Sequence, residues 1–293
     1  MAKAREIKKR MKAVGNIRRI TKTMQMIATS KFAKAQQRAL ASKPYVEGIF
    51  ELVTELASKA GNITHPLISG APKTKPGAKE LLLLITSDRG LCGPYNASVL
   101  RTFFRMLKDA GGHDKFAVEI VGRKGVGTLA YNKVPTERVH QFGDTPRYED
   151  IERLAQQYMD RFTAGEITGV KIVSMRFIST ARQRPEIMQL LPLKAPTSTD
   201  AAAAKGPRVE YDFNPPPGEL LNDLLPVTVK TTLYQVFNDA IVSEHVARMI
   251  AMKSATDAAG KMGKLLNRRY NRARQSQITT ELTEIISGAA ALE

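Results

Sequence analysis

Residues 3–32 read KAREIKKRMKAVGNIRRITKTMQMIATSKF, and this stretch decides the fold. No proline interrupts residues 3–42, and Gly15 is their only glycine. We therefore expect a long N-terminal helix, in which Pro44 allows a kink or break before a further helical stretch over residues 46–60. The apolar residues recur mostly at steps of three or four, which is typical of one apolar stripe along an α-helix: Ile7, Met11, Val14, Ile17, Ile20, Met24, Ile27 and Phe32.

The other end of the chain repeats this pattern at greater length. No proline follows Pro226, and one broad apolar face runs from Leu233 to Leu266. At about 1.5 Å per residue, a helix from Pro226 to Ser287 would span roughly 90 Å, several times the diameter of a small domain. Such a helix cannot be buried by its own chain's core, so we expect it to pair with the N-terminal helix. Its alanine-rich stripe predicts a close approach of the two backbones.

The net charge of +17, from 45 Lys and Arg against 28 Asp and Glu, lies near the two ends of the chain. Residues 1–43 hold 13 basic residues and one acid, and residues 245–280 hold eight basic residues and one acid. Since these two stretches carry +19, the remainder carries −2. A balance this basic favours an acidic partner, which is a nucleic acid, an anionic membrane surface or a negatively charged protein.

Between the two ends, strands of the buried type alternate with amphipathic helices. The strand Leu81–Ser87 is followed by the helix Asn96–Gly111, and such alternation favours a mainly parallel sheet covered by helices. The expected fold class is therefore α/β, with a long antiparallel coiled coil of the N- and C-terminal helices plus a central Rossmann-like α/β domain. The other expected elements are strands at Phe116–Arg123, Arg138–Phe142 and Val170–Ser179, a helix at Tyr148–Ala164 and an edge strand at Pro185–Leu193.

The motif SDRGLCGPYN at residues 87–96 follows the first expected strand and precedes a helix. Proteins of the α/β class place phosphate-binding loops at this point. The motif lacks the Gly-Lys-Ser/Thr of a nucleoside triphosphate site and the spacing of a dinucleotide loop. We interpret it as a central loop in which two glycines bend a strand into a helix, with Cys92 as a small buried residue. The residues of this loop are Asp88, Arg89, Gly90, Cys92 and Gly93.

No motif for catalysis or metal binding is found. The four histidines, His65, His113, His140 and His245, occur in separate segments without HExxH or paired-histidine spacing, and the sequence has no GxSxG. A single cysteine excludes an internal disulfide and a Cys-based zinc site. The longest aliphatic run, Leu81–Ile85, is far short of the roughly 20 residues of a membrane-spanning helix. We expect no catalytic residue, no cofactor, no metal and no direct membrane insertion.

Residues 2–11 read AKAREIKKRM, and residues 20–31 read ITKTMQMIATSK. Together they resemble the N-terminal helix of the gamma subunit of F-type rotary ATP synthase, bacterial type. Residues 87–93 resemble its central loop, and residues 243–257 resemble its C-terminal helix. Residues 270–289 are similar to the end of that helix nearly residue for residue. The resemblance covers both ends of the chain and its centre, and the motifs together are highly specific.

The resemblance implies the central rotor shaft of a proton-translocating ATP synthase. Such a subunit is itself non-catalytic and couples rotation of the membrane ring to ATP synthesis and hydrolysis at the catalytic subunits. In this family the terminal helices form an antiparallel coiled coil inside a ring of three catalytic and three non-catalytic subunits. The implied partners are the alpha and beta subunits of this catalytic hexamer, the epsilon subunit and the membrane c-ring, with no nucleic acid.

The resemblance also implies a location and two groups of contact residues. The chloroplast form's cysteine-bearing insertion is absent and the family motif begins at residue 2, so the expected location is the cytoplasmic face of the bacterial inner membrane, with a mature organellar chain as the alternative. Carried over to this sequence, Arg274, Gln275 and Thr279 would contact a catalytic-subunit loop near the top of the shaft. Met24, with Lys22, would face the acidic lever loop of the catalytic subunit.

The foot that contacts the membrane ring corresponds to Tyr211, Phe213 and Asn214. Asn214 stands where family members commonly carry glutamate. The expected division of the chain is an N-terminal shaft helix at residues 1–61, a central α/β domain at 79–195, a linker and foot segment at 196–218 and a C-terminal shaft helix at 219–293.

Two other classes of function remain as alternatives. A basic coiled-coil nucleic-acid-binding protein would use the same charge, but Phe32 is the only aromatic residue in residues 1–43 and Tyr270 the only one in 245–280, so stacking on bases would be poor. A nucleotide-hydrolysing enzyme built on residues 87–96 would show ATPase activity in the isolated chain. The rotor shaft is the leading hypothesis.

Overall fold

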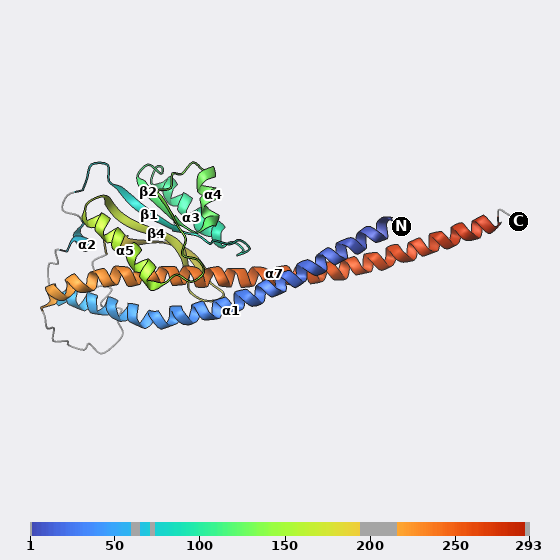
Figure 1. Cartoon of the computed structure of the whole chain (residues 1–293), viewed down its shortest axis with the longest axis horizontal. Helices are drawn as coiled ribbons and strands as arrows, with labels where there is room; N and C mark the ends of the chain where they lie inside the picture. The colour runs from blue at the N-terminus through green and yellow to red at the C-terminus, as the bar shows by residue number, and fades with distance from the viewer. Residues whose placement is uncertain (1, 60–64, 71–73, 194–215, 291–293) are drawn as a thin grey trace. The chain divides into compact units, whose positions relative to one another are not determined.

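The computed structural model describes residues 2–59, 65–70, 74–193 and 216–290. The chain forms two compact units, a smaller one of Met1–Ser30 with Arg248–Glu293 and a larger one of Lys31–Ala247. Two long helices, α1 (Ala2–Lys59) and α7 (Pro217–Ala290), each contribute residues to both units (Figure 1). The expected long terminal helices are therefore confirmed.

The larger unit contains one five-stranded sheet in the order β3-β2-β1-β4-β5. The pairs β3–β2, β2–β1 and β1–β4 are parallel, whereas β5 is an antiparallel edge strand on β4. All five expected strands are present, and their ends shift by a few residues, as is usual for sequence-based boundaries. Their bounds are β1 (Lys79–Ile85), β2 (Phe116–Val121), β3 (Arg138–His140), β4 (Ile167–Phe177) and β5 (Gln183–Leu191).

Four shorter helices accompany the sheet in the described residues, and the sequence predicted two of them. The expected helices are α3 (Tyr95–Asp109) and α5 (Tyr148–Thr163), and a short α2 (Pro66–Ser69) precedes β1. The helix α4 (Arg123–Tyr131) was missed because Gly125 and Gly127 weaken its helical pattern. Gly125 is required by packing, since a Cβ there would lie 2.5 Å from Ile120 Cδ1.

The sheet separates two apolar cores, one on each face. Strand β1 is buried on both faces, because Leu82 and Leu84 pack with α3 and α4 whereas Leu81 and Leu83 pack with α5. Such burial is typical of a central parallel strand and explains its continuous aliphatic sequence. Figure 1 shows α3 and α4 on one side of the sheet and α5 with α7 on the other.

Both long helices take part in the second of these cores. Ile49, Val53 and Leu56 of α1 are buried together with Val229 and Leu233 of α7. The helix α1 continues through Pro44 without the break that the sequence allowed, and α7 likewise continues through Pro226. These parts of α1 and α7 therefore belong to the core of the α/β unit.

In the smaller unit the two helices run antiparallel, as expected. The hydroxyl groups of Thr21 on α1 and Thr256 on α7 lie 2.8 Å apart. Moving toward the N-terminus of α1, Val14 packs with Ala259 and Leu266, which lie toward the C-terminus of α7. One series of buried or half-buried positions of α7 recurs at alternating steps of four and three, which is the heptad spacing of a coiled coil: Met252, Thr256, Ala259, Gly263, Leu266 and Tyr270.

The structure corrects the apolar stripes expected from the sequence. Ile17, Ile20 and Ile27 of α1 are more than half exposed, and Met262 and Leu265 of α7 are about half exposed. The seam between the helices is instead narrow, and small residues such as Thr256, Ala259 and Gly263 alternate in it with larger ones, which allows the backbones to approach closely at the small positions. The smaller unit therefore buries only part of its apolar surface.

The close contact at the start of α4 gives a stability prediction. Gly122 has φ +87°, and a Cβ there would lie 2.2 Å from the carbonyl oxygen of Thr86. We expect Gly122→Ala to lower the free energy of unfolding by about 2 kcal/mol or more, measured by urea unfolding of the purified chain. Gly127→Ala in the same helix is the control, because no atom lies within 4 Å of its added Cβ, and it should be neutral or stabilising. Equal midpoints for the two variants would contradict the prediction.

Candidate functional site

The described residues contain neither a metal-binding cluster nor a membrane-spanning helix. Within them, no three His, Cys, Asp or Glu side chains come close enough together to hold an ion. No helix there is sufficiently long and apolar to cross a bilayer. The candidate functional surfaces are therefore the exposed side chains of the smaller unit and the central loop of the larger one.

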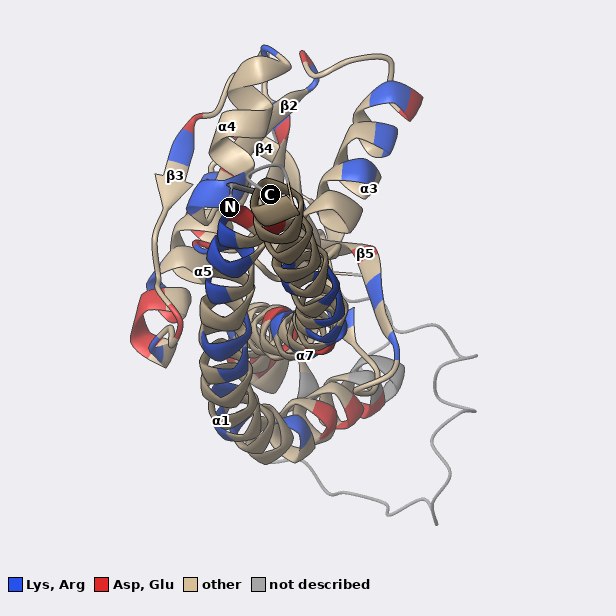
Figure 2. Cartoon of the chain, turned by 90° about the vertical axis from the view of Figure 1, so that its right-hand side faces the viewer, with Lys and Arg blue, Asp and Glu red and all other residues tan. Residues whose placement is uncertain are grey.

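The surface of the smaller unit is strongly basic. Residues 1–30 hold nine Lys and Arg and one acid, Glu6. Arg10 pairs with this acid at 2.7 Å, and Lys22 is among the exposed cations. Figure 2 shows Lys and Arg recurring along α1 and α7. Exposed cations at this density attract an acidic surface over distances of about 10 Å, the range set by salt screening.

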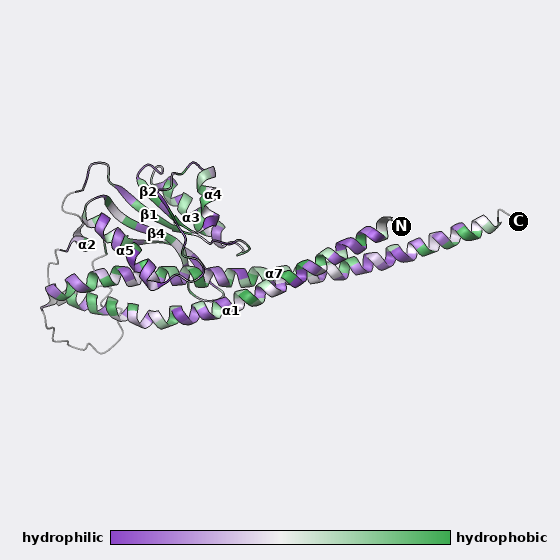
Figure 3. Ribbon diagram, viewed as in Figure 1, coloured by the Kyte–Doolittle hydropathy of each residue, from purple (hydrophilic) through white to green (hydrophobic). Residues whose placement is uncertain are grey.

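The same surface also exposes large apolar side chains. Figure 3 shows apolar residues recurring among the polar ones along both helices. Exposed apolar surface of this extent is typical of a site of protein–protein contact. The residues that are more than half exposed are Ile17, Ile20, Met26 and Ile27 on α1 and Met262, Ile278, Leu282, Ile285 and Ile286 on α7.

The expected catalytic-subunit contacts fall at two levels of the smaller unit. Lys22 is exposed and Met24 is half-buried, and both lie close to Thr21, which is opposite Thr256. Arg274 lies 18 residues beyond Thr256 on α7, which is about 27 Å along the helix. Arg274, Gln275 and Thr279 are all exposed. The structure thus leaves these side chains accessible, but it does not bring the two groups together. The expected foot residues Tyr211, Phe213 and Asn214 lie outside the described residues.

The central loop is a tight turn held by its own side chains. Leu91 and Gly93 have φ of 63° and 56°, and this left-handed backbone turns the chain from β1 into α3. The Asn96 side chain accepts a hydrogen bond from the Ser87 N–H at 3.0 Å and donates to the Ser87 hydroxyl at 2.7 Å. Cys92 is 2% exposed and packs in the core, as expected. Arg89, in contrast, extends an exposed side chain.

The loop also caps the start of a second helix, α4. At the start of α4, the Arg123 N–H donates to Asp88 Oδ1 at 3.2 Å, and the Lys124 N–H donates to the Ser87 carbonyl at 3.0 Å. The Gly125 N–H donates to Thr86 Oγ1 at 3.1 Å. Because a phosphate would need these same donors, the arrangement disfavours a nucleotide at this terminus.

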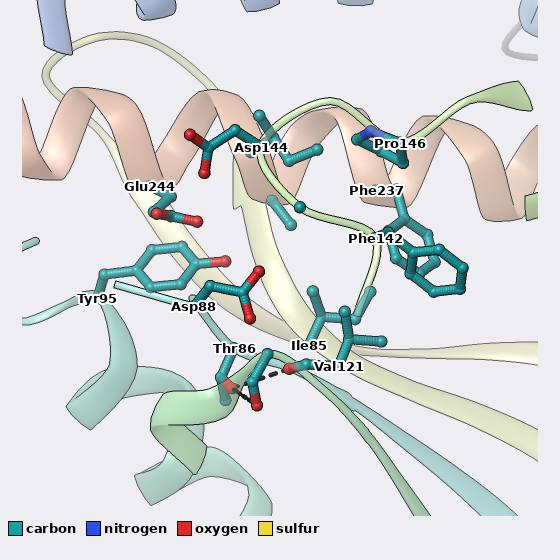
Figure 4. Close-up of a pocket in the computed structure, with 14 residues that line it drawn as sticks. Ile85, Thr86, Asp88, Tyr95, Val121, Phe142, Asp144, Pro146, Phe237 and Glu244 are labelled. Atoms are coloured by element: carbon teal, nitrogen blue, oxygen red, sulfur yellow. Dashed lines mark hydrogen bonds between the residues drawn. The ribbon is translucent and has the colours of Figure 1, made fainter. Parts of the chain in front are cut away.

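An acidic hollow lies at the carboxyl ends of β1 and β2, beside α7. It encloses about 410 Å³ including its open mouth. Figure 4 shows the carboxylates of Asp88, Asp144 and Glu244 and the ring of Tyr95 around it. Negative side chains repel phosphate, so the lining of the hollow also argues against a nucleotide-hydrolysing site.

Asp144 joins this hollow to helix α1, and the sequence analysis missed it. Its carboxylate accepts a hydrogen bond from the Lys31 ammonium group, and Arg89 Nη1 lies 3.8 Å from the same oxygen. Burial alone would raise the pKa of Asp144. The hydrogen bond from Lys31 and the charges of Lys31, Arg89 and His245 outweigh burial and hold this pKa below its usual value. No local pattern could have revealed the pair, because 113 residues separate Lys31 from Asp144.

A second charged group is fully enclosed between the sheet and α5. Glu119 of β2 accepts hydrogen bonds from Tyr158 at 2.8 Å and from Arg161 at 3.0 Å, and it lies 2.7 Å from His140 Nε2. Burial acts to raise the pKa of Glu119, but the bonds from His140 and Tyr158 and the nearby charges lower it overall. The carboxylate is 0% exposed, so this network is structural and is closed to a substrate.

A third carboxylate, Asp239 on α7, has a raised pKa. Gln235 Nε2 donates to Asp239 Oδ1 at 3.0 Å, and the Ser42 hydroxyl of α1 donates to Gln235 Oε1 at 2.9 Å. Burial raises the pKa of Asp239 to about 6, although the bond from Gln235 and the charges of Arg176 and Lys43 act in the opposite direction. This group thus titrates close to neutral pH.

Comparisons with a family model and with known relatives identify the same family. A family model described as ATP synthase matches residues 3–292. The ATP synthase gamma chain of Rhodopirellula baltica is 42% identical over 298 residues, covering all of both chains. The ATP synthase gamma chain of Leptospira biflexa is 38% identical over 294 residues, again covering all of both chains.

Solved structures share the fold at lower identity. A chain of the Euglena gracilis mitochondrial ATP synthase assembly of OSCP, F1 and c-ring aligns with a TM-score of 0.68 at 17% identity, over 99% of this chain and 95% of that one. A chain of the Tetrahymena thermophila mitochondrial ATP synthase central stalk and c-ring aligns with a TM-score of 0.58 at 21% identity, over 80% of this chain and 99% of that one.

The pKa of Asp239 predicts a pH dependence of stability. The folded pKa of about 6 lies above the unfolded value of about 3.9, so the folded chain binds a proton more tightly. The contribution of this group to the free energy of unfolding should therefore rise as pH falls from about 7 to about 4. We expect wild type to gain stability relative to Asp239→Asn over this range, measured by urea unfolding at each pH.

Asp144→Asn provides a control of opposite sign. The pKa of Asp144 is lowered by folding, so its stabilising contribution is present above the unfolded value of about 3.9 and is lost as pH falls below it. A flat difference between wild type and Asp239→Asn from pH 7 to pH 4 would contradict the assignment of the raised pKa.

Proposed function

The chain belongs to the ATP synthase family as a gamma chain, and we propose that its paired helices are the central rotor shaft of a proton-translocating ATP synthase. Rotation of the membrane ring is coupled through this shaft to ATP synthesis and hydrolysis at the catalytic subunits. The partners are the alpha and beta subunits of the catalytic hexamer, the epsilon subunit and the membrane c-ring.

The observation that carries this proposal is the surface of the smaller unit, in a chain that matches its relatives from end to end. Two helices that bury only a narrow seam of each other leave both charge and apolar surface for partners. A protein collar with acidic side chains is complementary to that combination. Separate exposed ion pairs contribute only about 0–1 kcal/mol each, so the collar can guide the shaft without fixing it in one position.

The residue roles follow from the same proposal. Lys22 and Met24 face the acidic lever loop of a catalytic subunit, and Arg274, Gln275 and Thr279 contact another of its loops nearer the tip of α7. The accessibility of these side chains, except for half-buried Met24, supports the assignment. The foot on the membrane ring is formed by Tyr211, Phe213 and Asn214, within the linker and foot segment at residues 196–218.

We further propose that the chain performs no chemistry itself and lies at the cytoplasmic face of the bacterial inner membrane as a peripheral subunit. The capped terminus of α4 and the acidic lining of the adjacent hollow support the first point. The bacterial origin of the relatives supports the second. The comparisons give no support to a nucleic-acid-binding coiled coil. Such a protein would bind DNA with a steeply salt-dependent affinity, even when catalytic subunits are present.

Co-purification tests the proposed function directly. A tagged chain expressed in its own cell should come out with a hexameric ATPase ring, whereas the purified chain alone should hydrolyse no ATP above background. Isolation without alpha and beta subunits would overturn the proposal. So would ATP turnover by the pure chain that Gly90→Val abolishes, because it would make the central loop a catalytic site.

Alanine at Arg274 and Gln275 tests the contact near the tip of α7. We expect the double variant Arg274→Ala/Gln275→Ala to lower coupled ATP synthesis in membrane vesicles without changing the unfolding of the α/β unit. Arg269→Ala is the control, because Arg269 is exposed and lies about 140° from Arg274 and about 120° from Gln275 around the helix. Unchanged synthesis, coupling and assembly in the double variant would remove the assigned contact.

A further inference from the structure

The loop between β3 and α5, at residues 141–147, contacts both long helices within the larger unit. Phe142 contacts α7, and Asp144 contacts α1. Gly143 between them has φ +68°, a left-handed backbone that turns the two flanking side chains in different directions. We call residues 141–147 the clasp loop.

The contact with α7 is made between two aromatic rings, and one of them, Phe142, is also held by the sheet. The ring of Phe142 meets the ring of Phe237 edge-on, with centroids 5.4 Å apart and planes at 87°. On its other side Phe142 stacks on His140 at 5.8 Å. His140 is in turn 2.7 Å from the buried Glu119 carboxylate. This end of the clasp loop is therefore fixed to the sheet and to α7 together, as Figure 4 shows for Phe142 and Phe237.

The contact with α1 is the ion pair of Asp144 with Lys31. The Asp144 side chain is 24% exposed and that of Lys31 is 39% exposed, so solvent screens the pair only in part. Arg89 of the central loop lies near the same carboxylate. One carboxylate thus serves two cations.

Lys31 lies at the point where α1 passes between the two units. It is the first residue of the larger unit, and the residues of α1 before it belong to the smaller unit as part of the same helix. The nearest contacts of α1 in the larger unit, at Phe32, Ala35 and Ala39, are apolar, and Ser42 further along α1 donates a hydrogen bond to Gln235 of α7. Apolar contacts are non-directional, whereas a hydrogen-bonded ion pair fixes one orientation of the helix about its own axis.

We propose that Asp144 is a positioning residue for rotation, which rests on the proposed rotor function. Through Lys31 it holds α1 at a fixed angle against the α/β unit, while Phe142 holds the same loop on α7. Torque that enters the α/β unit then turns both helices together. Without Asp144, the part of α1 around Lys31 can shift against the α/β unit, and part of the rotation is lost before it reaches the catalytic subunits.

The test uses the whole complex in membrane vesicles, with ATP hydrolysis and ATP-driven proton pumping measured on the same sample. We expect Asp144→Asn and Lys31→Gln each to lower the number of protons pumped per ATP by about threefold or more, with assembly retained. The double variant should be no worse than the more affected single one, because both changes remove one interaction. Glu166→Gln is the control, since it removes the exposed pair with Lys75 at 2.9 Å and leaves α1 untouched.

A covalent replacement separates positioning from folding. Lys31→Cys/Asp144→Cys, in a Cys92→Ala background, should pump poorly until the two cysteines are joined by a short bismaleimide, after which pumping per ATP should recover. A purely structural role for the charges would not respond to the link. If Asp144→Asn fails to assemble, Lys31→Gln and the linked variant carry the test, because Lys31 lies on the partly exposed face of α1.

Either of two results would overturn the proposal: a normal pumping ratio in both single variants, or no recovery in a linked complex that is fully assembled. Failure of the rotor function itself would look different. In that case the unsubstituted chain would not be recovered with an ATPase ring, before any variant is compared.

Discussion

Two helices longer than the core of their own chain have to bury each other, and the rest of the structure depends on this constraint. In the smaller unit they meet along a seam in which Thr21 faces Thr256 and Ala259 packs with Val14. Small residues at the seam bring the backbones close, so each helix covers only a narrow band of its partner. Apolar and basic side chains outside the band remain exposed. A pair built in this way is stiff enough to persist but remains available to a surrounding partner.

The larger unit meets the same constraint by including both helices in an ordinary α/β core. The face of β1 that carries Leu81 and Leu83 is buried together with Val53 and Leu56 of α1 and with Val229 and Leu233 of α7. Apolar packing of this kind supplies most of the stability but little orientation. Directional polar contacts of these helices within the unit include Lys31 with Asp144, Ser42 with Gln235, and Lys230 with Glu152. These contacts add a defined orientation to the apolar packing.

Local periodicity explains how much of this could be predicted from the sequence. The run Leu81–Ile85 and the regular helical spacing of the two ends specify their elements through short-range patterns, and these predictions are confirmed. The helix α4 was missed because its sequence holds two glycines, of which Gly125 is required by close packing against Ile120 and Thr86. The exposure of Ile17 and Ile20 was missed because a single sequence does not say which part of a wide stripe forms the seam. The Lys31–Asp144 pair was missed because only the folded chain brings such distant residues together.

The capped terminus of α4 has a consequence for the conditions in which the chain works. Asp88 supplies, from within the chain, the negative charge that a helix N-terminus would otherwise take from a phosphate. A carboxylate that is part of the same fold is present at constant effective concentration. The start of α4 therefore needs no phosphate from solution to satisfy its first N–H groups. This end of the sheet can keep its fold whether nucleotide is plentiful or scarce around it.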